Sequence, residues 1–344
     1  MQKEVLVIKL GTAVITKNNG EIDNKVIRKI ADEIATLNKQ YRIVLVSSGA
    51  VGSGKSFFKN YKGSLAERKA AAAVGNPLLI QLYHRHFKKF GITVAQALCE
   101  RHHFSSRKQF LQLKETFEQF WDNNILPVVN ENDLVSNMEL KFSDNDELAT
   151  LIAIGFNADT LVICTSAGGL MDNEKKIIPK VEKIDEKILS YITKDKSSTG
   201  LGGMLSKITS TKLAASMGIR VCICGLTPET PIVSALDGKN GTSFKAQSSN
   251  LKARQKWLAS GSITLGSVYL DKGASNAVLN RKSLLAIGIK KIEGNFLSGE
   301  VVQLKDEENN IIGVAKAKLS AKEMNTHLNA KNMIAAHADD IVLF

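Results

Sequence analysis

Short apolar runs alternate with amphipathic segments through about residue 240. The apolar runs predict strands at 4–9, 42–47, 92–98, 125–129, 160–164 and 219–225. Apolar positions at helical spacing predict helices between them, at 24–39, 77–90, 106–122, 145–156 and 204–217. This alternation is typical of an α/β protein with an open, mainly parallel sheet sandwiched by helices. In such sheets, ligands bind at the carboxyl ends of the strands.

The pattern changes after residue 240. The segment 241–259 is polar and reads as a connector, and short β-like runs follow at 262–265, 268–270, 289–292, 300–304, 311–317 and 341–343. Turn signals at Asp271–Gly273 and Leu297–Glu300 separate some of these runs. The sequence therefore predicts a first domain over residues 1–255 and a small β-rich domain over residues 262–344.

Composition narrows the class of protein. The chain has 344 residues, of which 44% are hydrophobic and 23% charged, as is ordinary for a globular protein of two domains. No apolar run approaches the ~18 residues of a membrane span, and a strand is predicted almost at once after Met1, which leaves no room for a signal peptide. The four cysteines show no Cys-x-x-Cys spacing, so neither zinc nor a disulfide framework is expected. We expect a cytoplasmic protein.

The net charge of +12 is unevenly distributed. Residues 55–115 hold 12 Lys and Arg against 3 Glu, whereas residues 261–344 hold 10 Lys and Arg against 9 Asp and Glu. A positive surface at 55–115 would steer anionic substrates, although a solvated helical face is the simpler explanation of the charge. The nearly neutral C-terminal region argues against nucleic-acid binding, because phosphate contacts dominate that affinity.

Lys9 ends the first predicted strand, two residues before the glycine turn at Gly11. A buried ammonium is costly unless it meets an anion, and a glycine turn lets backbone N–H groups approach the same anion. These features indicate a phosphate site. An edge strand with a snorkelling lysine is the alternative from this segment alone.

The second predicted strand leads into Ser47–Ser56, a segment with three glycines and several hydroxyls. Such a segment at a strand end suits anion binding. Gly49–Ser56 also matches the Walker A pattern Gly-x-x-x-x-Gly-Lys-Ser. However, no predicted strand ends in the magnesium-binding Asp that this motif requires. A flexible connector is the further alternative.

Two further segments carry polar groups suited to ligands. Asn130 and Asp133 follow the fourth strand, and Asp144, Asn145 and Asp146 begin a helix. Asp144 is expected to cap that helix. The other acids and amides would suit an amino acid, with carboxylates for its ammonium group and amides for its carboxylate.

The segment 197–207 is rich in hydroxyls and glycines and leads into a helix with Lys207 in its first turn. It suits a nucleotide lid with a second positive charge, and a surface loop is the alternative.

Together these segments resemble the glutamate 5-kinases of the amino-acid kinase family. The order of Val-Ile-Lys-Leu-Gly-Thr, Ser-Ser-Gly-Ala, Pro-Val-Val-Asn-Glu-Asn-Asp, Asp-Asn-Asp and Gly-Gly-Met-x-x-Lys along residues 7–207 carries this resemblance. Asp271–Ala274 and Gly294–Glu300 resemble the PUA domain that many of these kinases carry. In the family, Ser-Ser-Gly-Ala is the meaningful part of the second segment, so the Walker A match is expected to be accidental.

The resemblance implies roles for individual residues. It implies that Lys9, Lys207 and Asp146 form the catalytic set, in which Asp146 organises the two lysines. Glutamate binding is implied for Ser48, Gly49, Asn130, Asp133 and Asn145. ATP binding is implied for Lys9, Gly11, Thr165, Ser166, Leu201, Gly202, Gly203, Met204, Leu205, Ser206 and Lys207.

The chain departs from the family pattern at one position. Thr165 is followed by Ser166, where the family usually has an aspartate near the nucleotide. This departure bears on ATP affinity and nucleotide preference, and leaves the phosphoryl-transfer set unaffected.

The implied reaction is the ATP-dependent phosphorylation of the γ-carboxylate of L-glutamate to γ-glutamyl phosphate, the first step of proline biosynthesis. A glutamate carboxylate is already ionised at pH 7 and needs no general base, so the need is for charge stabilisation by lysines, N–H donors and Mg²⁺. No protein-held metal is expected. The family also implies homodimers or homotetramers and feedback inhibition by proline. The alternatives are an aspartate, acetylglutamate or carbamate kinase, or an RNA-associated PUA protein.

Overall fold

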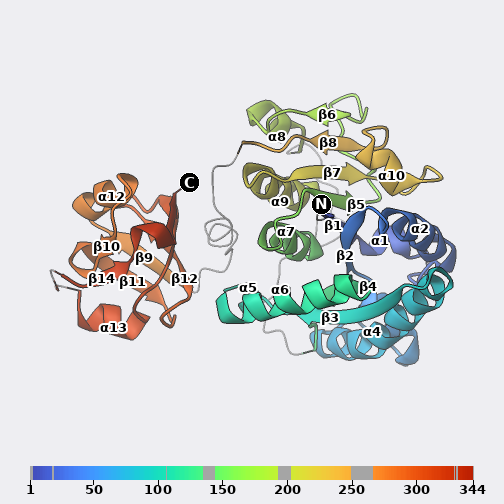
Figure 1. Ribbon diagram of the computed structural model, residues 1–344, viewed down its shortest axis with the longest axis horizontal. Coiled ribbons are helices and arrows are strands. Elements are labelled where there is room, and N and C mark those ends of the chain that lie inside the picture. The colour runs from blue at the N-terminus through green and yellow to red at the C-terminus, as the bar shows by residue number, and fades with distance from the viewer. Residues whose placement is uncertain are drawn as a thin grey trace. The chain divides into compact units, whose positions relative to one another are not determined.

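The computed structural model describes residues 3–17, 19–105, 107–134, 144–192, 203–248, 266–328, 330 and 332–343 (Figure 1). The chain divides into two compact units, one of residues 1–100 and 115–249 and the other of residues 101–114 and 250–344. The domain boundary predicted between residues 255 and 262 lies outside the described residues and stays a prediction.

The first unit contains the strands that the sequence predicts, and two more. They are β1 (Glu4–Leu10), β2 (Tyr41–Ser47), β3 (Thr93–Cys99), β4 (Ile125–Glu131), β5 (Thr160–Cys164), β6 (Lys180–Val181), β7 (Arg220–Cys224) and β8 (Thr242–Phe244). The helices up to residue 248 are α1 (Thr12–Ile15), α2 (Asn24–Leu37), α3 (Ala50–Gly54), α4 (Leu65–Phe87), α5 (His102–Ser105), α6 (Arg107–Asp122), α7 (Asn145–Gly155), α8 (Glu186–Ile192), α9 (Met204–Ser216) and α10 (Pro231–Leu236).

The eight strands form one sheet in the order β3-β4-β2-β1-β5-β7-β8-β6. Every neighbouring pair is parallel except β7 and β8. The prediction of a mainly parallel sheet sandwiched by helices is confirmed. The neighbouring strands β4, β2, β1 and β5 are parallel, so their carboxyl ends lie along one edge of the sheet.

The two faces of β1 pack against different helices. Leu6, Ile8 and Leu10 belong to the buried core that includes residues of α2, α4 and α10. Val7 and Lys9 alternate with them and therefore face the opposite side, where α7 contacts β1 and α9 contacts β7. Strand alternation thus directs Lys9 toward α7 and α9.

Helix α4 begins at Leu65, so the predicted start at residue 77 is wrong. Ser64 and Glu67 form a capping box at this end, in which each side chain bonds the other's backbone N–H. Alanine-rich sequence continues the helix with little entropic cost. Proline is common in the first turn of a helix, but Pro77 lies in the interior of α4.

Helices α3 and α4 cross at two glycines. A Cβ atom on Gly54 would lie 2.0 Å from the Ala71 carbonyl oxygen, and one on Gly75 would lie 1.7 Å from the Ala50 carbonyl oxygen. Only glycine permits this approach of backbone to backbone. Residues 50–54 are therefore a packed helix, which corrects the alternative of a flexible connector.

The second unit has its own core and sheets. Its strands are β9 (Gly266–Leu270), β10 (Leu284–Leu285), β11 (Ile289–Gly294), β12 (Val301–Lys305), β13 (Ile311–Lys316), β14 (Ile334–Ala336) and β15 (Ile341–Leu343), and its helices after residue 266 are α12 (Lys272–Leu279) and α13 (Ala321–Thr326). Five strands form the sheet β11-β9-β12-β13-β15, and β10 pairs with β14. The predicted strand at 262–265 lies outside the described residues.

One predicted turn of this unit is wrong. Asp271 caps α12 by accepting the N–H of Ala274, so Asp271–Gly273 starts a helix. The turn before β12 is confirmed, because Gly299 has the positive φ of 94° that such a turn needs.

None of the described helices is both long and apolar enough to cross a membrane. All four cysteines are buried and free.

Candidate active site

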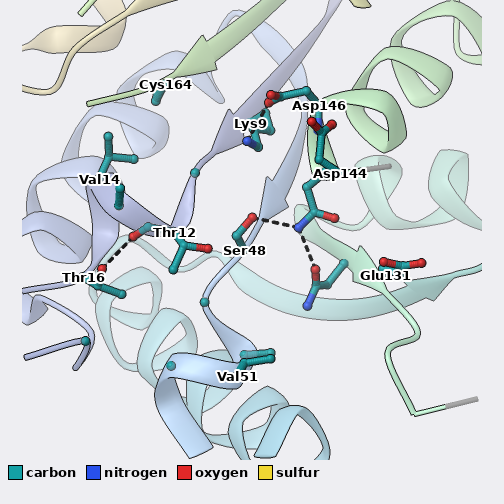
Figure 2. A pocket seen from close by; sticks show the side chains of 18 of the residues that line it. Lys9, Thr12, Val14, Thr16, Ser48, Val51, Glu131, Asp144, Asp146 and Cys164 are labelled. Atoms are coloured by element: carbon teal, nitrogen blue, oxygen red, sulfur yellow. Dashed lines mark hydrogen bonds and ion pairs between the residues drawn. The ribbon is translucent and has the colours of Figure 1, made fainter. Parts of the chain in front are cut away.

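A cavity of about 610 Å³ opens at the carboxyl ends of the central strands (Figure 2). Its wall contains most of the residues that the sequence singles out. They are Lys9, Gly11, Ser48, Gly49, Asn130, Asp133, Asn145, Asp146, Thr165, Ser166 and Lys207. Segments up to about 200 residues apart in sequence thus meet in one place.

An ion triad lies at this cavity. The Lys9 ammonium lies 2.6 Å from Oδ1 of Asp146, and the Lys207 ammonium lies 3.0 Å from Oδ2 of the same carboxylate. Asp146 is fully buried, and the two lysines are 5% and 8% exposed. Two positive charges share one negative charge, so the triad carries a net charge of +1 beside the cavity. This is the arrangement that an anionic ligand stabilises.

Asp144 sets the position of the acid in the triad. Its Oδ1 accepts the N–H groups of Asp146 and Glu147 at 2.9 and 3.0 Å, which confirms its expected role as the cap of α7. Its Oδ2 accepts the Ser206 hydroxyl at 2.5 Å. Asp144 therefore ties the start of α7 to the first turn of α9, from which Lys207 projects. This second bond was not predicted.

A chain of amides extends along the cavity wall. The Asn145 amide donates to the Ser48 hydroxyl at 2.8 Å and to Oδ1 of Asn130 at 3.0 Å (Figure 2, dashed lines). The Asn130 amide in turn donates to Oδ1 of Asn76 on α4 at 3.2 Å. These bonds fix which atom of each amide faces its neighbour. Asn76 supports the site but was not predicted, because it lies before the predicted start of its helix.

A buried contact supports Ser48 from behind. The Ser47 hydroxyl lies 2.7 Å from the Tyr83 hydroxyl on α4, and both side chains are fully buried. Burial raises the pKa of Tyr83, so the phenol stays protonated and able to donate. The β2–α3 turn is thereby held against α4.

Gly11 and Gly49, to which the resemblance assigns ligand binding, differ in their surroundings. The Gly11 N–H already donates to the Cys164 carbonyl oxygen at 3.3 Å, so the structure does not offer it to a ligand. A Cβ there would lie 3.3 Å from the same oxygen, so the glycine serves close approach. Gly49 has a φ of 107°, and a Cβ there would lie 2.9 Å from Ile22 and 3.0 Å from Ile15. Its identity is required by the turn into α3.

The lid region is only partly described. Leu201 and Gly202 lie outside the described residues. Gly203 is the N-cap residue of α9, and Met204, Leu205 and Ser206 form its first turn, where Leu205 is 61% exposed. Thr165 donates its N–H to the Cys224 carbonyl oxygen at 2.8 Å, which holds the β5 end against β7.

The Walker A pattern does not form a phosphate loop. Gly49–Ser56 folds as the turn into α3, the helix itself and the start of a 3-10 turn at Lys55–Phe57. The Lys55 ammonium lies beside Gly20. A Cβ atom built on Gly20 would be only 2.0 Å from it. Within the described ranges, no group of three or more His, Cys, Asp or Glu side chains could hold a metal ion.

Comparison with known proteins now identifies the family. Residues 4–225 match the amino acid kinase family. The chain belongs to this family. Residues 266–334 match the PUA domain, which accounts for the β-rich second unit.

Relatives that match nearly the whole chain include glutamate 5-kinases. Glutamate 5-kinase of Aquifex aeolicus is 36% identical over 355 residues, covering 98% of this chain and 99% of that protein. Glutamate 5-kinase of Kosmotoga olearia is 35% identical over 341 residues, covering 98% and 93%. A carbamate kinase from Giardia lamblia bound to AMP-PNP covers 71% of this chain and 99% of its own at 20% identity with a TM-score of 0.53, and it shows the shared fold. The alternatives within the family are not favoured.

Proposed function

We propose that the protein transfers a phosphoryl group from ATP to the γ-carboxylate of L-glutamate, forming γ-glutamyl phosphate in the cytoplasm as the first step of proline biosynthesis. The observation that carries the proposal is the Lys9–Asp146–Lys207 triad beside a cavity lined with amides and carboxylates. The similarity to glutamate 5-kinases over nearly the whole chain supports it.

The triad fits the electrostatics of this reaction. The attacking carboxylate is ionised at pH 7, so no side chain has to remove a proton. The obstacle is the approach of two anions and the charge that shifts on the phosphoryl group in the transition state. The two lysines meet that charge, and Asp146 holds both ammonium groups in place beforehand.

The amide chain suits the amino acid. The Asn145 amide donates one hydrogen bond to Ser48 and one to Asn130, which holds this side chain in one orientation. Its amide oxygen can then accept a hydrogen bond from a ligand. Asp133 provides a carboxylate of the cavity wall for the ligand's ammonium group. We therefore place glutamate between the amide chain and Asp133, with its γ-carboxylate toward Lys9.

ATP is the proposed phosphoryl donor, bound on the side of Thr165, Ser166 and the start of α9. A Mg²⁺ ion on its phosphate oxygens would neutralise charge during transfer. The lysines and the α9 terminus fit anionic phosphates. The metal is proposed to arrive with the nucleotide; among the described residues, no group of three or more His, Cys, Asp or Glu side chains could hold it without further ligands.

An assay of ATP consumption with single acceptors tests this function. Wild-type protein, ATP and Mg²⁺ are incubated with L-glutamate, L-aspartate, N-acetyl-L-glutamate or carbamate, and hydroxylamine traps any acyl phosphate as a hydroxamate. We expect turnover and hydroxamate with L-glutamate only. Turnover with another acceptor and none with L-glutamate would contradict the proposal. Filter binding with RNA at several salt concentrations tests the RNA-associated alternative, for which we expect no specific binding.

Replacing Asp133 with asparagine should raise the KM for glutamate with a smaller change in kcat. The substitution keeps the shape but removes the charge that would meet the ammonium group. A charge-assisted contact is worth about 1.5–3 kcal/mol, so the rise should be roughly ten- to a hundredfold. Glu174→Gln, at an exposed acid paired with Lys176, is the control. An unchanged KM in Asp133→Asn would remove this residue from the substrate site.

Replacing Ser166 with aspartate restores the acid that the family usually has. If its absence weakens the nucleotide site, the variant should show a lower KM for ATP at an unchanged KM for glutamate. Steady-state kinetics with each substrate varied in turn measure both values. A higher or unchanged KM for ATP would show that other groups compensate for Ser166.

We also propose that the chain forms homodimers or homotetramers and is inhibited by proline. Both proposals rest on its family membership.

A further inference from the structure

The cavity wall contains a cation that the proposed mechanism does not use. Arg68 lies in the first turn of α4 and lines the cavity together with the catalytic residues. We propose that Arg68 binds the α-carboxylate of the amino-acid substrate and thereby selects free α-amino acids. This inference rests on the proposed function and assigns the third charged group of its substrate.

The charges of the ligand and of the cavity leave one group unmatched. Glutamate carries two carboxylates and one ammonium group. The proposed pose directs the γ-carboxylate to Lys9 and the ammonium group to Asp133. Among the residues that the structure describes, four Lys and Arg line the cavity, and two of these, Lys9 and Lys207, already share Asp146. In this described part of the wall, Lys55 and Arg68 are the two cations left for the α-carboxylate.

The packing of α4 places Arg68 on the correct face. Residues three or four apart lie on one side of a helix, so Arg68 shares a face with Ala71, Ala72, Gly75 and Asn76. On this face, Ala71 and Gly75 form the crossing with α3. Asn76 bonds Asn130 of the amide chain. Arg68 thus continues a row that already borders the substrate site, about 12 Å along the helix from Asn76.

Arg68 is also the better of the two cations. The Lys55 ammonium lies against the backbone at Gly20. The Arg68 guanidinium, in contrast, makes no ion pair or side-chain hydrogen bond within the described parts of the chain. Its planar fork of N–H donors matches a carboxylate in two parallel bonds, which an ammonium cannot do. The side chain is exposed and lines the cavity, so an incoming amino acid can reach it.

The test compares two acceptors that differ only at the proposed contact. L-Isoglutamine keeps the γ-carboxylate and the ammonium group of L-glutamate but has a neutral carboxamide in place of the α-carboxylate. In full-length protein, Arg68→Ala should raise the KM for L-glutamate roughly ten- to a hundredfold at nearly unchanged kcat. Arg68→Lys should recover part of this loss. The KM for L-isoglutamine, or its inhibition constant against L-glutamate, should change less than threefold.

Lys69→Ala provides the matched control, because Lys69 is the next residue of α4 and does not line the cavity. It should leave both constants unchanged. An unchanged KM for L-glutamate in Arg68→Ala would overturn the inference. Equal losses with L-glutamate and L-isoglutamine would also overturn it, since they would show a general effect on the site. Failure of the wild-type protein to phosphorylate L-glutamate would instead contradict the proposed function.

Discussion

Replacing Lys9 or Lys207 with alanine is expected to lower kcat by about a hundredfold or more, with little change in the KM for glutamate. Both ammonium groups lie at one buried carboxylate beside the cavity, at 2.6 and 3.0 Å. They act where charge redistributes on the phosphoryl group, so the loss should fall on the transition state. Removal of one such preorganised contact typically costs about 3 kcal/mol.

Steady-state kinetics of both variants, with ATP and glutamate varied separately, measure this effect. Lys212→Ala is the control, because Lys212 is an exposed lysine of α9 five residues beyond Lys207. It should retain wild-type kcat. Wild-type turnover in Lys9→Ala or Lys207→Ala would contradict the role of that lysine.

Replacing Asp146 with asparagine should damage both activity and stability. The substitution leaves two buried ammonium groups facing each other without a counter-charge. Removal of one partner from a buried ion pair typically costs about 3–5 kcal/mol. We expect a clearly lower Tm and a kcat at least about tenfold lower, because the lysines are no longer held in position.

Thermal unfolding with and without a non-hydrolysable ATP analogue separates this effect from general misfolding. The phosphates of the analogue supply the negative charge that the variant lacks. They should therefore raise the Tm of Asp146→Asn by more than they raise that of the wild type. Asp122→Asn breaks an exposed ion pair with Arg42 and should change the Tm little. A wild-type Tm and kcat in Asp146→Asn would show that the triad is dispensable.

The strands and the residues at their ends could be predicted from the sequence because both signals are local. Lys9 interrupts an apolar run, and polar groups follow the other strands directly. The carboxyl ends of parallel strands share one edge of the sheet, so these residues were expected to meet, and they line one cavity.

The features that were not predicted depend on contacts between distant segments or on weak local signals. The start of α4 rests on a capping box and on alanines, which have no clear apolar period. That error also concealed Asn76 and Arg68, which lie on the missed part of the helix. The Asp144–Ser206 bond joins residues 62 apart, and nothing in either segment indicates the other. Asp271 was interpreted as part of a turn because caps and turns favour the same residues.

Transfer of an oxygen isotope tests the central proposal most directly. L-Glutamate labelled with ¹⁸O in both γ-carboxylate oxygens is incubated with the protein, ATP, Mg²⁺ and hydroxylamine. The released phosphate is then analysed by ³¹P NMR. If the γ-carboxylate attacks the phosphoryl group, a labelled oxygen bridges carbon and phosphorus. Hydroxylamine then attacks the carbonyl carbon, and that oxygen leaves with the phosphate. We predict inorganic phosphate that carries one ¹⁸O atom, whereas unlabelled phosphate would show that water, and not glutamate, accepts the phosphoryl group.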